Sequence, residues 1–160
     1  MIVDLESRIQ AIEDVEAIKR LKYRYFRHLD LKEWNELGAC FVADATVSYG
    51  DGRYSFAGVD AILGFLRTSI GADTGTITIH HGHHPEIELI SETAARGTWA
   101  LYNYLSNEKH RRSLRMGAYY HDEYVKVGGE WKLRHSGYTT IFHEEWSRDD
   151  LPSLKQILPG

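Results

Sequence analysis

The chain has 160 residues, of which 42% are hydrophobic and 26% charged, and its formal net charge at pH 7 is −4. This length and composition predict one globular domain with its own core. The small negative charge gives no reason to expect a nucleic-acid or anionic-membrane partner. The single cysteine, Cys40, excludes an intrachain disulfide. Because neither a signal-peptide pattern nor a membrane-spanning apolar run is present, we expect a cytoplasmic protein.

The first seventy residues carry mainly helical patterns. Apolar residues recur at steps of three and four, or multiples of these, over residues 5–29. This periodicity predicts one long amphipathic helix with Asp4 or Ser7 as its N-cap. A capping-box variant that begins at Asp30 predicts a second, short helix through Leu37. Between this helix and a third one at 59–70, a short strand, an Asp-Gly turn and a return strand are expected.

From Thr76 onward the pattern is that of β-strands separated by short turns. The expected strands cover residues 76–90, 93–106, 114–127 and 131–142. Residues 143–160 form a polar C-terminal tail of the single domain 1–160. Helices followed by a run of strands predict an α+β fold. A curved antiparallel sheet wrapped around the long N-terminal helix would make a cone-shaped α+β barrel and enclose a ligand cavity.

The segment 76–89 holds four of the nine histidines, His80, His81, His83 and His84. On a regular strand His80 and His84 share one face, and His81 and His83 share the other. Ile87 and Leu89 favour the core, yet their odd numbers place them opposite His80. Either both faces of the strand are covered, or a β-bulge near residues 82–85 shifts the phase. A metal site formed by these histidines is the weaker alternative, because a closed site needs further ligands.

His80 and Asp30 are the favoured catalytic pair. An imidazole moves protons near neutral pH, and it does so best when a carboxylate holds its second ring nitrogen. The ordinary structural explanations are a helix N-cap for Asp30 and a hydrogen-bonded sheet residue for His80. Tyr25 and Tyr49 are candidate hydrogen-bond donors to a substrate carbonyl. The alternative for either tyrosine is a core residue with its hydroxyl at a rim.

Several strings resemble the nuclear transport factor 2-like superfamily, in its SnoaL-like and scytalone dehydratase-like branches. Within that superfamily they are most similar to bacterial bile acid 7α-dehydratases. The resemblance covers roughly residues 14–149. It is carried by the strings Asp-Val-Glu-Ala-Ile-Lys at 14–19, Tyr-Phe-Arg at 25–27, Leu-Asp at 29–30, Ser-Tyr at 48–49, His80 with Gly-His at 82–83, Pro-Glu-Ile at 85–87 and Gly-Ala at 117–118 with Tyr120.

The resemblance implies a role for each matched residue. His80 matches a catalytic general acid/base, Asp30 its carboxylate partner, and Tyr25 and Tyr49 pocket tyrosines. The substrate contacts it suggests are Asn103, His84, Trp99, Tyr120 and Thr140, with a core position as the alternative for Trp99.

Two of these positions depart from the bile acid enzyme. Asn103 replaces an aspartate there, so a second titrating group is lost. Thr140 replaces an arginine, which puts an identical anionic substrate in doubt.

Taken together, the residues and the resemblance predict a cofactor-independent and metal-independent dehydratase. The expected substrate is a hydrophobic, hydroxylated ring ketone such as a steroid or a polyketide-like compound. Isomerase-like or cyclase-like proton transfer on a similar ring is the alternative, and a non-catalytic small-molecule-binding module is a third. The resemblance also implies a homo-oligomer, a dimer or a trimer, formed through the outer face of the sheet.

Overall fold

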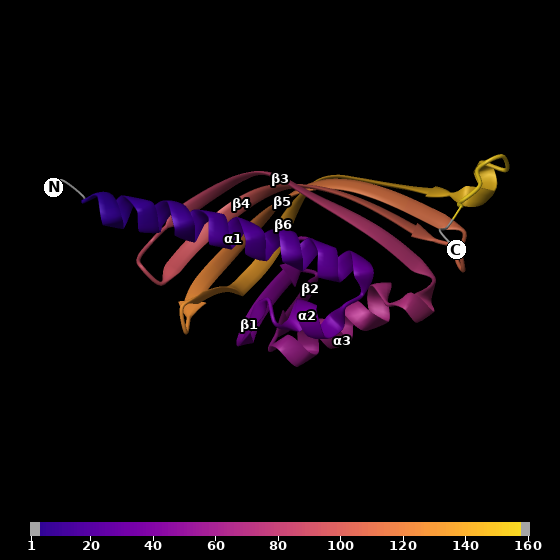
Figure 1. The fold of residues 1–160 in the computed structure, drawn as a ribbon. Coiled ribbons are helices and arrows are strands. Elements are labelled where there is room, and N and C mark those ends of the chain that lie inside the picture. The colour runs from indigo at the N-terminus through magenta and orange to yellow at the C-terminus, as the bar shows by residue number, and fades with distance from the viewer. Residues whose placement is uncertain (1–3, 158–160) are drawn as a thin grey trace.

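The computed structural model describes residues 4–157. Figure 1 shows a long helix, α1, that crosses one face of a curved sheet, with α2 and α3 beside its C-terminal half. In the described range the helices and strands are α1 (Leu5–Leu31), α2 (Trp34–Gly38), β1 (Phe41–Tyr49), β2 (Tyr54–Ala57), α3 (Val59–Ile70), β3 (Thr76–Leu89), β4 (Ala94–Asn107), β5 (Arg112–Val127) and β6 (Glu130–Ser147), with short 3-10 turns at Ala72–Thr74 and Arg148–Asp150.

The six strands found in the described residues form one sheet in the order β2-β1-β6-β5-β4-β3. The predicted α+β fold, a curved sheet around an N-terminal helix, is confirmed. Two details differ from the expectation. β1 pairs with β6 in parallel, so the sheet is mixed. The sheet is also open, with β2 and β3 as its edges. A hairpin imposes antiparallel pairing, but β1 and β6 lie far apart in sequence and no hairpin joins them.

Helix α1 begins and ends as its local sequence dictates. The Asp4 carboxylate caps the N-terminus by accepting the backbone N–H of Ser7 at 2.9 Å. At the other end Lys32 adopts the left-handed conformation, with φ 62° and ψ 30°, and stops the helix. The prediction that Asp30 begins a second helix is therefore wrong. Asp30 lies in the last turn of α1, and α2 begins only at Trp34.

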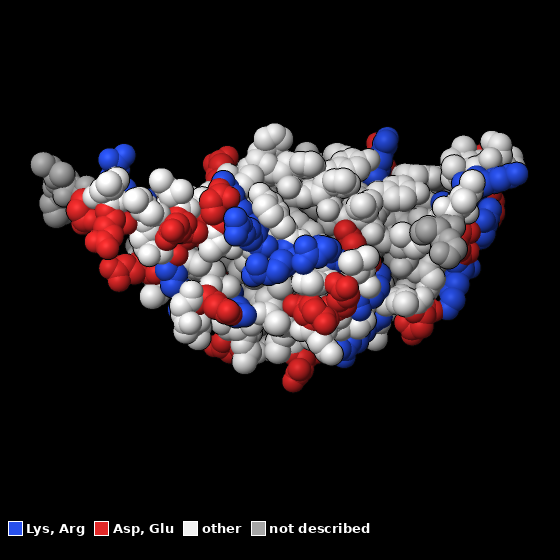
Figure 2. All heavy atoms as spheres, in the orientation of Figure 1, with Lys and Arg blue, Asp and Glu red and all other residues white. Residues whose placement is uncertain are grey.

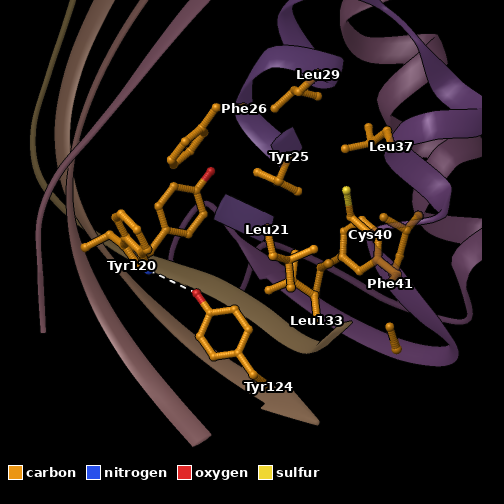
Figure 3. Packing of buried hydrophobic residues seen from close by; sticks show 14 of the residues in the cluster. Leu21, Tyr25, Phe26, Leu29, Leu37, Cys40, Phe41, Tyr120, Tyr124 and Leu133 are labelled. Atoms are coloured by element: carbon orange, nitrogen blue, oxygen red, sulfur yellow. Dashed lines mark hydrogen bonds between the residues drawn. The ribbon is translucent and has the colours of Figure 1, made fainter. Parts of the chain in front are cut away.

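The core lies between the sheet-facing side of α1 and the concave face of the sheet. Ile18, Leu21, Tyr25 and Leu29 of α1 are buried there. Figure 3 shows Tyr120 rising from the sheet toward Phe26 of α1, and the two rings lie 5.8 Å apart between centroids. The first turns of α1 extend past this core, which leaves the apolar side chains at their N-terminal end exposed.

One charged pair is enclosed in this core. The Lys22 ammonium of α1 lies 2.8 Å from the Asp122 carboxylate of β5, and both side chains are fully buried. The same carboxylate accepts hydrogen bonds from the hydroxyls of Tyr124 and Ser136, each at 2.8 Å. Burial lowers the pKa of Lys22, and Asp122 opposes that shift. The pair joins the helix to the sheet.

The C-terminal region is more ordered than its polar composition indicates. Residues 143–147, predicted as part of a tail, continue strand β6 along β5. Arg148 follows and is buried, and its guanidinium donates to the hydroxyls of Ser106 and Ser113. The polar sequence misled the prediction because residues 143–145 form an exposed part of β6, where cross-strand ion pairs such as Arg112–Glu145 take the place of apolar packing.

Figure 2 shows acidic and basic side chains interspersed on the face that carries α1, with basic side chains gathered over its middle. This face therefore carries no field of a single sign. Within residues 4–157 no helix combines the length and the apolar character needed to cross a membrane.

Candidate active site

Strand β3 changes its phase at a β-bulge. Its register against β4 shifts between His83 and Glu86, and His84 has φ 48°. Before the bulge His80 faces the inside of the sheet, and after it Ile87 packs against the core. Of the two explanations offered for the conflict between His80 and Ile87, the structure shows the bulge. One strand can therefore present a polar group to a cavity and an apolar group to the core.

Asp30 and His80 form a close pair at the end of α1. The His80 Nδ1 atom lies 2.6 Å from Asp30 Oδ1, and the backbone N–H of His80 donates to Oδ2 at 2.8 Å. The hydroxyl of Thr78, two residues earlier on the same face, donates to Oδ1 at 2.9 Å. These contacts hold the carboxylate in place, with side chains that are only 17% exposed for Asp30 and 8% for His80. Nδ1 is engaged by Asp30, so Nε2 is the ring nitrogen available to a ligand.

His80 forms part of the wall of a cavity of about 410 Å³ between α1, α3 and the concave face of the sheet. This volume is within the usual range for a small-molecule site. Its walls are mostly apolar and aromatic, with polar groups at a few points. The lining residues are Tyr25, Leu29, Tyr49, Gly50, Asp51, Arg53, Tyr54, Phe65, Leu66, Ser69, Ile70, His80, Asn103, Leu105, Leu114, Met116, Tyr120, Tyr138, Thr140 and His143.

Tyrosine hydroxyls gather in the same cavity. The Tyr25 and Tyr49 oxygens lie 3.0 Å apart and share a hydrogen bond. Burial raises the pKa of Tyr25, Tyr49 and Tyr120 well above the usual range for a phenol. These phenols therefore keep their protons at ordinary pH and act as hydrogen-bond donors rather than as bases.

The structure brings together most of the residues predicted for the site. Asn103 lies opposite His80 on the neighbouring strand and lines the cavity together with Thr140. The residue is 8% exposed, and among the described residues its Oδ1 atom has no hydrogen-bond partner. A buried acceptor without a partner costs free energy unless a ligand supplies the donor. Asn103 is therefore placed to bind a ligand hydroxyl or amine.

Two residues predicted to contact the substrate lie elsewhere. Trp99 is fully buried, and its Nε1–H donates to the Tyr124 hydroxyl at 2.9 Å, outside the cavity wall. Trp99 is therefore a core residue, which is the alternative to a substrate contact that its sequence position left open. His84 is exposed at the bulge, with its ring 5.9 Å from that of His83. Strict alternation placed His84 beside His80, and the bulge removes it from that face.

Several lining residues were missed by the sequence analysis. Tyr138 and His143 enter from β6, and Asp51 and Arg53 enter from the turn before β2. Alternation alone could have identified Tyr138, because it has the same parity as Thr140. His143 has the opposite parity and lines the cavity because the register of β6 shifts at Ile141. No pattern in the sequence indicates that shift.

Gly82 maintains the contact between His80 and α1. A Cβ atom at Gly82 would lie 2.2 Å from a ring carbon of Phe26, which stacks on the His80 imidazole at 6.2 Å between centroids. Gly82→Ala is expected to destabilise the protein by about 1–3 kcal/mol, because Phe26 is buried and has little room to move. Urea denaturation of the two proteins measures this difference.

Gly64→Ala is the matched control for this substitution. Gly64 lies in the middle of α3 with nothing within 4 Å of the added methyl group. Alanine at this position is expected to stabilise the helix by about 0.5–1 kcal/mol. A loss of stability with Gly64→Ala equal to that with Gly82→Ala would contradict the explanation based on Phe26.

Comparison with known proteins identifies the family. Residues 10–136 match the model of the SnoaL-like domain. Among solved structures, a scytalone dehydratase-like protein from Novosphingobium aromaticivorans superposes with a TM-score of 0.79 at 29% identity, covering 87% of this chain and 91% of that one.

Two more distant structures share the fold. Hexachlorocyclohexane dehydrochlorinase LinA-type3 from Novosphingobium barchaimii has a TM-score of 0.79 at 16% identity and covers 95% of this chain and 99% of its own. ActVI-ORFA from Streptomyces coelicolor has a TM-score of 0.68 at 15% identity, with coverage of 79% and 96%.

The family match extends over most of the chain, and the superfamily recognised from the sequence is confirmed. The narrower resemblance to bile acid 7α-dehydratases stays a prediction. With this fold and this match, the chain belongs to the SnoaL-like domain family.

Proposed function

We propose that the protein is a lyase that removes water from a hydrophobic, hydroxylated ring ketone without a cofactor. One observation carries the proposal. His80, held by Asp30 at 2.6 Å, forms part of the wall of a cavity of about 410 Å³ that also contains protonated phenols. A base and hydrogen-bond donors in one apolar cavity are the groups that removal of a proton beside a carbonyl requires.

The reaction begins with proton abstraction. His80 Nε2 takes a proton from the carbon next to the substrate carbonyl, and Asp30 stabilises the imidazolium that forms. Negative charge develops on the carbonyl oxygen as the C–H bond breaks. The Tyr25–Tyr49 pair donates a hydrogen bond to that oxygen. Because both phenols are buried and their pKa values are raised, they donate without losing their protons.

Elimination completes the reaction. The electron pair of the enolate forms a carbon–carbon double bond, and the neighbouring C–O bond breaks. The departing hydroxide takes the proton held by His80 and leaves as water, so His80 returns to its starting state. The Asn103 amide accepts a hydrogen bond from the substrate hydroxyl, which fills its vacant Oδ1 position and holds the leaving group near His80.

The apolar walls support a ring compound as the substrate. Phe65, Leu66, Leu105, Leu114 and Met116 line the space beyond the polar groups. Flat, hydrophobic molecules gain most from such walls because they bury apolar area without leaving a polar group unpaired. Steroid and polyketide-like ketones fit this description.

An isomerase or a cyclase is the second candidate. Asn103 cannot give or take a proton, and this favours chemistry in which His80 alone moves one proton between two carbon positions. Such a reaction uses the same enolate and the same phenols, and no hydroxide leaves. The mass of the product distinguishes the two reactions.

A turnover assay tests the proposal. Wild type and His80→Gln are incubated with a panel of hydroxylated ring ketones, and the loss of the mass of one water is followed by mass spectrometry. Wild type is expected to dehydrate at least one of these compounds, and His80→Gln to be slower by about 10³-fold. Incubation in D₂O shows whether a proton exchanges when no water is lost.

His28→Gln is the matched control. His28 forms an equally short pair, with Nδ1 2.6 Å from a Glu33 oxygen, but it lies in a different groove. This variant is expected to keep the wild-type rate. Equal losses in the two histidine variants would reject His80 as the specific base. Proton exchange without loss of water would favour the isomerase or cyclase, and binding without any reaction would favour a binding module.

A further inference from the structure

Lys32 belongs to the surroundings of the catalytic pair although it does not line the cavity. Its ammonium group donates to the Thr78 hydroxyl at 2.9 Å, and that hydroxyl donates to Asp30 Oδ1 at 2.9 Å. The same Asp30 oxygen is 2.6 Å from His80 Nδ1. A continuous chain of hydrogen bonds therefore runs from Lys32 through Thr78 and Asp30 to His80.

The direction of each hydrogen bond in this chain follows from its first member. An ammonium group has only donors, so the Thr78 oxygen must accept from Lys32. The single hydroxyl proton of Thr78 is then directed to Asp30. The carboxylate, which also accepts the backbone N–H of His80 at 2.8 Å, remains an acceptor toward Nδ1. His80 is held with its proton on Nδ1, and the lone pair of Nε2 is left for the substrate.

The backbone conformation at Lys32 is unusual for a lysine and places its side chain toward β3. Lys32 has φ 62° at the C-terminus of α1, in the left-handed region that is unfavourable for any residue with a Cβ atom. Glycine is the usual residue at such a position. Lysine here costs backbone free energy, and what it adds is a cation that reaches Thr78 of β3.

We propose, on the basis of the proposed function, that Lys32 is a positioning residue that acts through Thr78 to keep His80 a neutral base. A positive charge beside the Asp30–His80 pair disfavours a second positive charge on the imidazole. It also balances the charge of Asp30, which would otherwise favour the protonated imidazole.

Other ionisable groups line the same cavity as His80. Those that line the cavity are Tyr25 of α1, Tyr49 of β1, Asp51 and Arg53 of the following turn, Tyr54 of β2, Tyr120 of β5, and Tyr138 and His143 of β6. Burial lowers the pKa of Lys32 itself, and the charge of Asp30 opposes that shift. All of these groups other than Lys32 stay unchanged in a Lys32 variant, so a difference between variants reports the charge of Lys32.

The test is an NMR titration of the His80 imidazole in the full chain, which needs no substrate. The chain has nine histidines, and the His80→Gln variant identifies the His80 signals by their absence. Lys32→Gly removes the cation and suits the left-handed backbone. It is expected to raise the His80 titration midpoint by roughly 0.5–1 pH unit without lowering the melting temperature. Lys32→Arg keeps the charge and is expected to leave the midpoint at its wild-type value.

Thr78 variants test whether Lys32 acts on His80 through the Thr78 hydroxyl. Thr78→Val removes the hydroxyl and is expected to raise the midpoint as well, and Thr78→Ser to restore it. If Lys32 acts through Thr78, the double variant Lys32→Gly/Thr78→Val shifts the midpoint by less than the sum of the two single shifts. An additive double variant would overturn the route through Thr78.

The titration separates this proposal from the proposed function. An unchanged midpoint in Lys32→Gly, or equal shifts in Lys32→Gly and Lys32→Arg, overturns the proposal even if the wild type dehydrates its substrate. A shift in Lys32→Gly alone supports the proposal even if none of the ring ketones reacts. Where a substrate is found, the acidic limb of kcat/KM is expected to move in the same direction as the midpoint.

Discussion

Asp30→Asn is expected to lower kcat/KM by about 10³- to 10⁴-fold while the protein stays folded. The carboxylate accepts three hydrogen bonds, from the Thr78 hydroxyl, the His80 backbone and His80 Nδ1. An asparagine offers one oxygen and one amide NH₂ group at the same positions. If the oxygen keeps the backbone N–H, the NH₂ group faces Nδ1. The imidazole then carries its proton on Nε2 and can no longer accept one from the substrate.

Two measurements check this result. Steady-state kinetics with the substrate found in the turnover assay gives the loss in kcat/KM, and ¹⁵N chemical shifts of His80 report which ring nitrogen is protonated. Asn103→Asp is an informative comparison, because it places a second carboxylate opposite His80 on the neighbouring strand and leaves Asp30 in place. An Asp30→Asn enzyme that kept more than a tenth of its kcat/KM would contradict the role given to the carboxylate.

Asp122→Ala is expected to have the largest effect on stability, a loss of about 3–5 kcal/mol. The substitution leaves the Lys22 ammonium fully buried without its counter-charge, and it removes the acceptor for Tyr124 and Ser136. An unpaired buried charge costs far more than the pair itself contributes. Chemical denaturation followed by tryptophan fluorescence measures the difference.

Two further variants define the cause of this loss. Glu123→Ala removes an exposed carboxylate one residue further along β5 and is expected to change stability by less than about 0.5 kcal/mol. Adding Lys22→Met to Asp122→Ala removes the unpaired cation and is expected to restore part of the loss. A double variant less stable than Asp122→Ala would show that packing, rather than the isolated charge, dominates the effect.

The helix and strand patterns predicted the α+β class and the order of the elements, because they reflect local rules. The three- and four-residue apolar steps of α1 and the Asp4 cap are visible in the sequence and are present in the structure. The phase conflict in β3 was also visible, because His80 and Ile87 required opposite phases of one strand, but the sequence left both a bulge and a strand covered on both faces as explanations. Local rules could not predict the features that depend on tertiary contacts, such as the extension of β6 to Ser147.

Part of the candidate site was also predicted from the sequence. His80, Asp30, Tyr25 and Tyr49 were found from residue chemistry and family resemblance, and the structure places all four together. Lys32 was missed because the capping-box pattern at Asp30 assigned it to the first turn of a second helix, where it would be an ordinary surface lysine. Only the left-handed backbone there, together with a strand 46 residues away, brings its ammonium group to Thr78.

The phase change in β3 has a consequence for recombination within the family. Before the bulge the strand presents His80 to the cavity, and after it Ile87 and Leu89 pack against the core. Between the pairs His80–Asn103 and Ile87–Gly97, β3 has one residue more than β4, so deleting one residue between His83 and Glu86 would remove the bulge and still leave His80 and Ile87 on the same face. A chimaera that joins a foreign cavity half to this core half therefore needs either this bulge or a regular junction that is one residue shorter.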